Sequence, residues 1–337
     1  MNSAVRSRRA RLVLILVFVL LVGAVVLSLG VGARPIAPGS VLQALLAPQD
    51  GNADHIVVLT QRVPRTLIGI LAGAALALAG TLMQGLTRNP LADPGLLGVN
   101  SGASVAVLGA IVLLGISAPS GFVWFAFAGA AMAAAVVAAI GSRGPDGGDP
   151  AKLALTGAAV TAGLTAVTLL ILTTDRSALD VYRYWSVGGL TARGVDTVAL
   201  VAVPILVGVV LAATCARGLD LIALGEETAT GLGHDVTRTR TVGIIATILL
   251  CGGATAIAGP IVFLGLLVPH ALRGLVGSDY RWLLLIGAPA GALVLLVSDV
   301  LGRVIALPGE VQAGLVVAFV GAPVLISLVL RRRQVVL

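Results

Sequence analysis

Residues 62–103 read RVPRTLIGILAGAALALAGTLMQGLTRNPLADPGLLGVNSGA. After its two arginines the stretch is apolar for about twenty residues, which is the length that a helix needs to cross the hydrocarbon core of a bilayer. Gly69, Gly73 and Ala77 recur at every fourth position within it. Small residues at this spacing lie on one side of a helix and let a second helix approach closely. The stretch therefore predicts a membrane-spanning helix that packs tightly against a neighbour.

The same stretch predicts where this helix ends. Asn89-Pro90 and Asp93-Pro94 follow the apolar run, and proline breaks a helix because it has no amide hydrogen to donate. Irregular backbone in a membrane protein is tolerated where it lines a cavity or meets water. We expect such a segment at the cytoplasmic end of the helix.

The whole composition is that of a membrane protein. Of the 337 residues, 58% are hydrophobic and 11% are charged, whereas soluble domains average roughly 45–50% and about 25%. Apolar runs of spanning length predict an all-α, polytopic membrane protein with about ten transmembrane helices, forming a single transmembrane domain over residues 1–337. The expected spans lie near 12–31, 67–86, 98–116, 122–140, 153–172, 197–216, 242–258, 261–276, 282–297 and 311–330.

The basic residues indicate how the chain is oriented. An even number of spans puts both termini on one side, and placing them in the cytoplasm leaves 15 basic residues inside and 7 outside. Acidic residues divide almost evenly between the sides, so the asymmetry is the one that the positive-inside rule describes. We therefore expect a multi-pass protein with both termini cytoplasmic, and we interpret the net charge of +7 as topological rather than as a nucleic-acid surface.

No catalytic or metal-binding motif is present in the sequence. It contains no GxxxxGK[ST] loop for nucleotide phosphates, no HExxH and no GxSxG. Cys215 and Cys251 lie far apart in apolar segments, which predicts free, buried thiols. The three histidines are scattered, and His270 is expected to be a hydrogen-bonded core residue rather than an iron ligand. We expect no catalytic and no metal-ligating residues, so an ATP-driven step would need a nucleotide site on another subunit.

Residues 62–103 resemble a signature of the FecCD family, the permeases of type II ABC importers for iron siderophores, haem and cobalamin. Three later stretches carry the same resemblance, in order and at comparable spacing. Gly259-Pro-Ile-Val-Phe-Leu-Gly-Leu-Leu-Val-Pro-His270 with Arg273 is similar to GxIxFxGLxxPHxxR, Asp299-Val-Leu-Gly-Arg303 to DxxxR, and residues 225–233 to the coupling loop. The chain departs from the family before the last span, where Pro308 precedes Glu310 in place of a Glu-Leu-Pro motif.

The resemblance implies a docking site at the outer side of the membrane. Arg62, Arg65 and Arg303 lie at the outer ends of expected spans. The family pattern makes them a basic pocket that binds a glutamate on each lobe of an extracytoplasmic substrate-binding protein, and paired arginine donors suit carboxylates. The alternative is that these long side chains only anchor the helices at the membrane interface.

The resemblance implies two further sites on the cytoplasmic side. The inner loop, about residues 217–241, is expected to form two short helices that are broken at Gly225 and seat on an ATPase; the alternative is an interfacial amphipathic helix. Asn89 and Leu91 resemble cytoplasmic gate residues, with a helix cap and a packing residue as the alternative. The implied coupling residues are Leu221, Leu224, Gly225, Glu226, Ala229 and Gly233.

The resemblance therefore implies a permease subunit in a bacterial inner membrane that moves a ferric siderophore by alternating access. Its expected partners are a second permease subunit, with a heterodimer favoured over a homodimer, two cytosolic ATPases that hold ATP and Mg²⁺, and a binding protein. A cobalamin or haem permease would share every motif. A secondary transporter would need ionisable residues within its spans, and the sequence has almost none there. An intramembrane enzyme would need a nucleophile and a base, which no motif supplies.

Overall fold

The computed structural model describes residues 3–32, 34–116, 118–141, 143, 150–191, 194–307 and 309–333. Regular structure in these residues is helical throughout. Pro308, where the sequence departs from the family pattern, lies outside the described residues. The helices are α1 Ser3–Gly30, α2 Pro38–Leu46, α3 Ala53–Val57, a π-helical segment Val58–Arg62, α4 Val63–Leu86, a 3-10 turn Pro94–Leu97, α5 Val99–Leu114, α6 Pro119–Gly141, α7 Pro150–Thr174, α8 Arg176–Ser186, α9 Val195–Ile222, α10 Glu226–Gly231, α11 Val236–Ala258, α12 Leu264–Val276, α13 Tyr280–Ile305 and α14 Ala313–Arg333.

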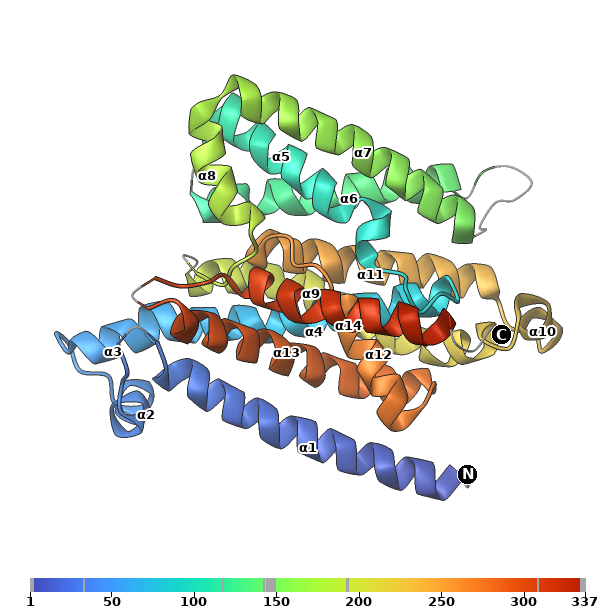
Figure 1. The fold of residues 1–337 in the computed structure, drawn as a ribbon, viewed down its shortest axis with the longest axis horizontal. Helices are drawn as coiled ribbons and strands as arrows, with labels where there is room; N and C mark the ends of the chain where they lie inside the picture. Colours follow the sequence, from blue (N-terminus) through green and yellow to red (C-terminus); the bar gives the residue numbers. More distant parts are fainter. Residues whose placement is uncertain are drawn as a thin grey trace.

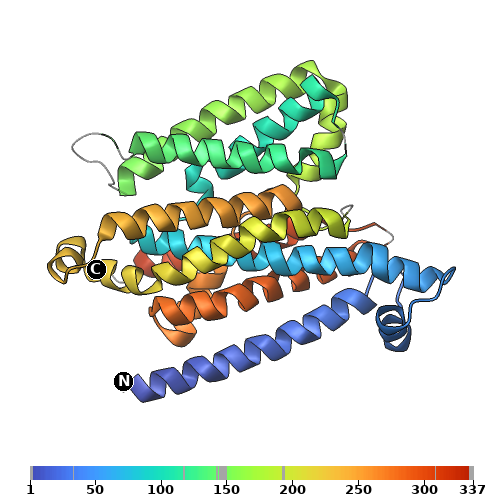
Figure 2. The same cartoon turned by 180° about the vertical axis from the view of Figure 1, so that it is seen from behind.

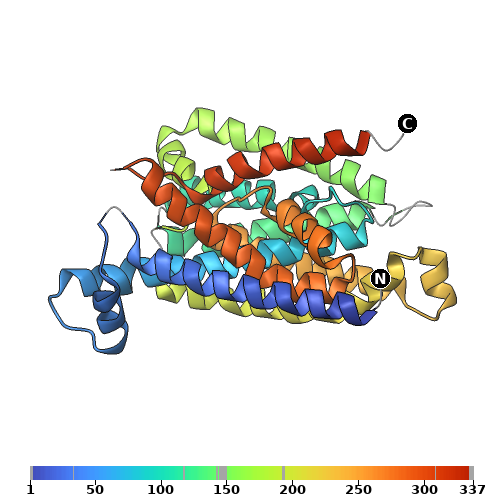
Figure 3. The same ribbon diagram turned by 60° about the horizontal axis from the view of Figure 1, so that its bottom comes forward.

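The long helices run side by side and form one elongated bundle (Figure 1, and from behind in Figure 2). Helices α5 to α8 make up one side of it, and α1 lies along α13 on the opposite side. The start of α1 and the end of α14 lie at the same end of the bundle as α10, whereas α2 and α3 lie at the other end (Figure 3). The polar connections are thus gathered at two opposite ends, which we call the α10 end and the α2–α3 end.

The expected spans correspond to helices of the structure. Seven helices in the described part of the chain are long and apolar enough to cross a membrane, and three shorter apolar helices begin at Val99, Leu264 and Ala313. Together they account for the ten runs found in the sequence, which confirms the all-α polytopic fold. The spanning helices differ in how much of them is buried inside the protein. In the helix that includes α4, 78% of the apolar window is buried, whereas in α1 the buried share is 17%. Helix α4 is therefore central and α1 is peripheral.

The small-residue face of α4 packs as predicted. A methyl group added to Gly73 would lie 2.4 Å from the carbonyl oxygen of Gly291 in α13, and one added to Gly69 would lie 2.5 Å from the side chain of Leu296. Gly80 is even closer to α12, since an added methyl would lie 1.9 Å from the carbonyl oxygen of Gly265. Van der Waals contact between backbones needs this absence of side chains, so the glycine spacing determines which side of α4 meets α13.

Two connections are more helical than the sequence predicted. The expected loop 32–66 contains the predicted short piece as α2, but helical structure begins again at Ala53 and continues without a gap into α4. The Asn52 side chain accepts the amide hydrogen of Asp54 at 3.0 Å, which is an N-cap that starts this helix. A 34-residue helix is about 51 Å long, so it exceeds a hydrocarbon core of about 30 Å and projects at the α2–α3 end. The expected outer segment 173–196 likewise contains α8, at whose start the Asp175 side chain accepts the amide hydrogen of Ala178 at 3.1 Å.

Candidate functional site

The three arginines predicted to form one site do come together, at the α2–α3 end. Arg65 of α4 and Arg303 of α13 both bind Asp299, which lies one turn before Arg303 and has no exposed area. The Arg65 Nη2 atom lies 2.8 Å from Asp299 Oδ1, and its Nε atom lies 3.0 Å from both carboxylate oxygens. Arg303 donates from Nε to Asp299 Oδ2 at 3.0 Å. One buried carboxylate thus joins two arginines that are far apart in the sequence.

Arg303 and Arg62 also bind the end of α1. Arg303 Nη1 donates to the carbonyl oxygen of Ser28 at 2.7 Å, and Arg62 Nη1 donates to that of Leu29 at 2.7 Å. The last carbonyls of a helix have no partner within the helix, and they carry the negative end of its dipole. Two guanidinium groups at this position therefore cap α1 and hold it against α4 and α13.

The burial of this cluster bears on both roles considered for the arginines, docking of a binding protein and anchoring at the membrane interface. Arg62, Arg65 and Arg303 are 6%, 8% and 2% exposed, so their charges do not extend into the interface as simple membrane anchors would. Their donors are also occupied within the chain, so docking stays a prediction. Glu310 is the one partly exposed member, and its Oε2 atom lies 2.7 Å from Arg65 Nη1. An incoming carboxylate would meet Arg65 at the place that Glu310 occupies.

The break at Gly225 in the predicted coupling loop is confirmed, but the first of the two expected short helices is the end of the long helix α9. Helix α9 ends at Ile222 and α10 begins at Glu226, and Gly225 between them has a φ of 109°. Only glycine adopts such an angle readily. Gly233, after α10, has a φ of 77°. A glycine with a positive φ therefore lies on each side of α10, at the α10 end of the bundle.

The predicted coupling residues divide into exposed and buried ones. Leu224 and Leu232 are each 64% exposed, and Leu221 is half-buried. Ala229 has no exposed area, because α10 packs this residue inward against the rest of the chain. The coupling role of Ala229 stays a prediction, because its side chain is covered in this arrangement, whereas the two exposed leucines are available for contact with a partner.

Glu226 makes contacts that the sequence did not indicate. Its Oε1 atom lies 3.3 Å from Nη2 of Arg88, which follows α4, and 2.6 Å from Nη2 of Arg240 in α11. Arg88 is 138 residues away in the chain. Its basic character was the only signal in the sequence, and charge alone does not identify a partner.

The segment after α4 is a series of tight turns, and Asn89 stabilises the first of them. Its Oδ1 atom accepts the amide hydrogen of Leu91 at 3.0 Å, which is a side-chain turn within the loop rather than a helix cap, so the gate role stays a prediction. Asp93 similarly accepts the amide hydrogen of Gly95 at 2.8 Å. Burial raises the pKa of the Asp93 carboxyl, and this hydrogen bond opposes the rise. The turns therefore depend on side chains as well as on proline.

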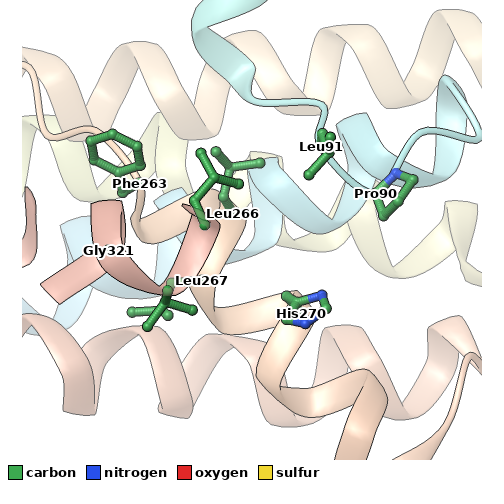
Figure 4. A pocket seen from close by; sticks show the side chains of 9 residues that line it. Pro90, Leu91, Phe263, Leu266, Leu267, His270 and Gly321 are labelled. Atoms are coloured by element: carbon green, nitrogen blue, oxygen red, sulfur yellow. The ribbon is translucent and has the colours of Figure 1, made fainter. Parts of the chain in front are cut away.

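Leu91 lines a pocket between this segment, α12 and α14 (Figure 4). Leu266, Leu267 and Gly321 face the same space. The pocket has room for about one water molecule, so in this arrangement it is not a passage for a larger molecule. Phe263, which also lines it, has a φ of 68°. A positive φ is strained for a non-glycine residue and persists only where the surrounding structure maintains it.

His270 also lines this pocket. In the part of the chain that the structure describes, no group of three or more His, Cys, Asp or Glu residues is placed to hold a metal ion. Arg273, also in α12, donates to the side chain of Gln84, whose amide donates to the carbonyl oxygen of Gly265 at 3.4 Å. This network joins α12 to α4.

Comparisons with known proteins agree over nearly the whole chain. A family model described as the FecCD transport family matches residues 13–331. The chain is 46% identical over 315 residues to the ferric enterobactin transport system permease protein FepD of Escherichia coli, covering 94% of each protein. It is 35% identical to the hemin transport system permease protein HmuU of Yersinia pestis, covering 99% of each. A solved structure, described as an inward-facing conformation of a metal-chelate type ABC transporter, is similar with a TM-score of 0.82 and 27% identity, covering 94% of this chain and 98% of the other.

Proposed function

Because this chain belongs to the FecCD transport family, we propose that it is the membrane-spanning permease subunit of an ABC importer that moves a ferric siderophore across a bacterial inner membrane. The observation that carries the proposal is the 46% identity, over 94% of both chains, to a ferric enterobactin permease. Haem is the second candidate cargo, supported by the 35% identity to a hemin permease. Cobalamin remains a third, since its permeases would share the motifs.

The energy for transport comes from other subunits in this proposal. The sequence has no phosphate-binding loop of the GxxxxGK[ST] form, so ATP and Mg²⁺ are held by two cytosolic ATPases. Leu224 and Leu232, both exposed at the α10 end, supply an apolar contact for one of them. ATP binding moves the ATPases, the loop around Gly225 moves with them, and the path opens to the other side. The two states, with the path open to one side or to the other, make different contacts, and this difference determines which state is favoured.

The remaining partners follow from the same proposal. A second permease subunit, different from this one, completes the path, and an extracytoplasmic binding protein delivers the chelate at the α2–α3 end. A carboxylate of that protein replaces Glu310 on Arg65, while Arg62 and Arg303 keep α1 in place beside it. Leu91, with Asn89 setting its turn, closes the path at the cytoplasmic end. Both termini are cytoplasmic, in keeping with the 15 basic residues on that side.

The test is reconstitution of the importer in lipid nanodiscs and liposomes from this chain, the second permease, the ATPase and the binding protein. We expect ATP-dependent uptake of a ferric siderophore, with ferric citrate, haemin and cobalamin as competing cargoes. A Leu224→Asp variant should lose ATPase association, because it places a charge in an apolar contact. Glu227→Gln, an exposed change two residues beyond the Gly225 break, is the matched control.

Two results would contradict the proposal. Uptake that continues without any ATPase subunit would identify a secondary transporter. Preferred uptake of haemin or cobalamin over every ferric siderophore would leave the importer assignment standing and replace its cargo.

A further inference from the structure

We propose that Glu226 is a positioning residue that joins the coupling helix α10 to the gate segment at residues 87–92, so that movement of α10 reaches Leu91 through Arg88. The proposal rests on the proposed function, because it assigns a path for the motion that an ATPase would impose. It goes beyond that function by identifying the side chains that carry this motion within the chain. The observation behind it is the pair of contacts from one carboxylate oxygen of Glu226 to Arg88 and Arg240.

The first step of the argument is the position of Glu226. It is the first residue of α10, directly after Gly225 with its φ of 109°. A glycine at such an angle permits large changes in backbone direction, so α10 is attached to α9 through a flexible joint. The buried Ala229 fixes the inner side of α10, and the carboxylate of Glu226 fixes its beginning. When α10 moves, Glu226 moves with it and acts on Arg88 and Arg240 through its ion pairs.

The second step is the position of Arg88. It follows the last turn of α4 and has a φ of 49°, in the left-handed region that non-glycine residues seldom adopt. This is the left-handed position that commonly follows the C-cap of a helix, and the Arg88 amide donates to the carbonyl oxygen of Gly85 at 3.3 Å there. The Arg88 side chain extends from this turn to Glu226, with which it forms an ion pair at 3.3 Å. Loss of this pair removes the side-chain link between the turn and α10.

The third step is the short distance along the chain from Arg88 to the gate. Only Asn89 and Pro90 separate Arg88 from Leu91. The ring of Pro90 fixes its φ, and the Asn89 side chain accepts the amide hydrogen of Leu91 at 3.0 Å. A change in the backbone of Arg88 is therefore passed on to Leu91 instead of being absorbed by a flexible linker. Leu91 in turn lines the pocket of Figure 4, together with Leu266 and Gly321.

Arg240 completes the arrangement. Its Nη2 atom lies 2.6 Å from the same oxygen of Glu226, and its side chain is 22% exposed. Helix α11 is packed against α4 and α9 in the middle of the bundle. The Glu226 carboxylate thus lies between α11, which is packed in the bundle, and Arg88 at the start of the gate segment. An exposed ion pair alone contributes little to stability, which favours a role in relative position over a role in folding.

The experiment uses the complete reconstituted importer, with Leu91→Cys as a reporter. Both native cysteines are buried, and they are replaced by alanine to remove any background. The rate at which a water-soluble thiol reagent modifies Leu91→Cys is measured with and without ATP. We expect ATP to change this rate several-fold in the parent protein. In Glu226→Gln and in Arg88→Gln the change should disappear, and uptake per ATP hydrolysed should fall about tenfold while the ATPase remains bound.

The matched control is Glu227→Gln, which removes the neighbouring carboxylate and should keep the parent behaviour. If the Glu226→Gln chain fails to fold and insert, Arg88→Gln tests the same ion pair from the other side. An unchanged ATP effect on Leu91→Cys in an assembled variant overturns the proposal. Loss of ATPase binding in Glu226→Gln also overturns it, because Glu226 would then be an intersubunit contact. Failure of the parent complex to take up cargo with ATP would instead refute the proposed function.

Discussion

Asp299→Asn gives the sharpest test of how the buried cluster at the α2–α3 end is held together. The change keeps the size and one oxygen of the side chain, so it leaves no cavity. It removes the negative charge that lies between Arg65 and Arg303, both of which are almost fully buried. Both arginines would then share a neutral partner in a region with little water.

The magnitude follows from the burial of the three groups. Removing one partner of a buried ion pair costs about 3–5 kcal/mol, because a charge is left without compensation. Asp299 has no exposed area and accepts from both guanidinium groups, so the full range applies. Since each 1.4 kcal/mol is about a factor of ten, the ratio of folded to unfolded protein should fall roughly 100- to 5,000-fold.

The assay is unfolding of the purified chain in mixed micelles by a denaturing detergent, followed by helical circular dichroism. Glu310→Gln is the matched control, because it removes a carboxylate from the same Arg65 but at a partly exposed position. An exposed pair contributes about 0–1 kcal/mol and is screened by salt. We therefore expect a small, salt-dependent loss for Glu310→Gln and a large, salt-independent loss for Asp299→Asn.

One result would refute this reasoning. If Asp299→Asn costs no more than Glu310→Gln, the ion pairs that Asp299 forms with the two arginines do not stabilise the fold. In that case the binding protein should associate more tightly with Asp299→Asn in nanodiscs, because both arginines are released for its glutamates. Tighter association together with unchanged stability would favour docking as the main role of the cluster.

Two further predictions concern topology and packing. Cysteine placed at Asp180 in α8 or at Thr230 in α10, both exposed positions, should react with an impermeant reagent from outside at Asp180 only, and the reverse pattern would invert the assigned orientation. Gly80→Ala should lower the free energy of unfolding by about 1–3 kcal/mol, because the added methyl would lie 1.9 Å from the carbonyl oxygen of Gly265. Gly109→Ala, where the methyl would meet open space, should be neutral or stabilising by about 0.4–1 kcal/mol, and equal effects of the two changes would argue against the tight α4–α12 contact.

Local features of the sequence predicted much of the fold. An apolar run of spanning length must become a helix in a membrane, because every backbone polar group needs a partner within the segment. This physical rule is why the ten runs correspond to helices. The small face at Gly69 and Gly73 was predictable for the same kind of reason, since it depends on what glycine allows at its own position, whereas the break at Gly225 was implied by the family resemblance.

Other features of the candidate sites were decided only by the tertiary structure. Arg65 lies 234 residues from Asp299, and Arg88 lies 138 residues from Glu226. A charged side chain carries no local information about its partner, because Coulomb attraction acts on whichever opposite charge the packing brings near. The burial of Ala229 and the capping of α1 by Arg62 and Arg303 are likewise consequences of how whole helices pack. The sequence by itself therefore determined which apolar segments of spanning length are helices, while helix packing decided which charges meet and which side chains remain exposed for a partner.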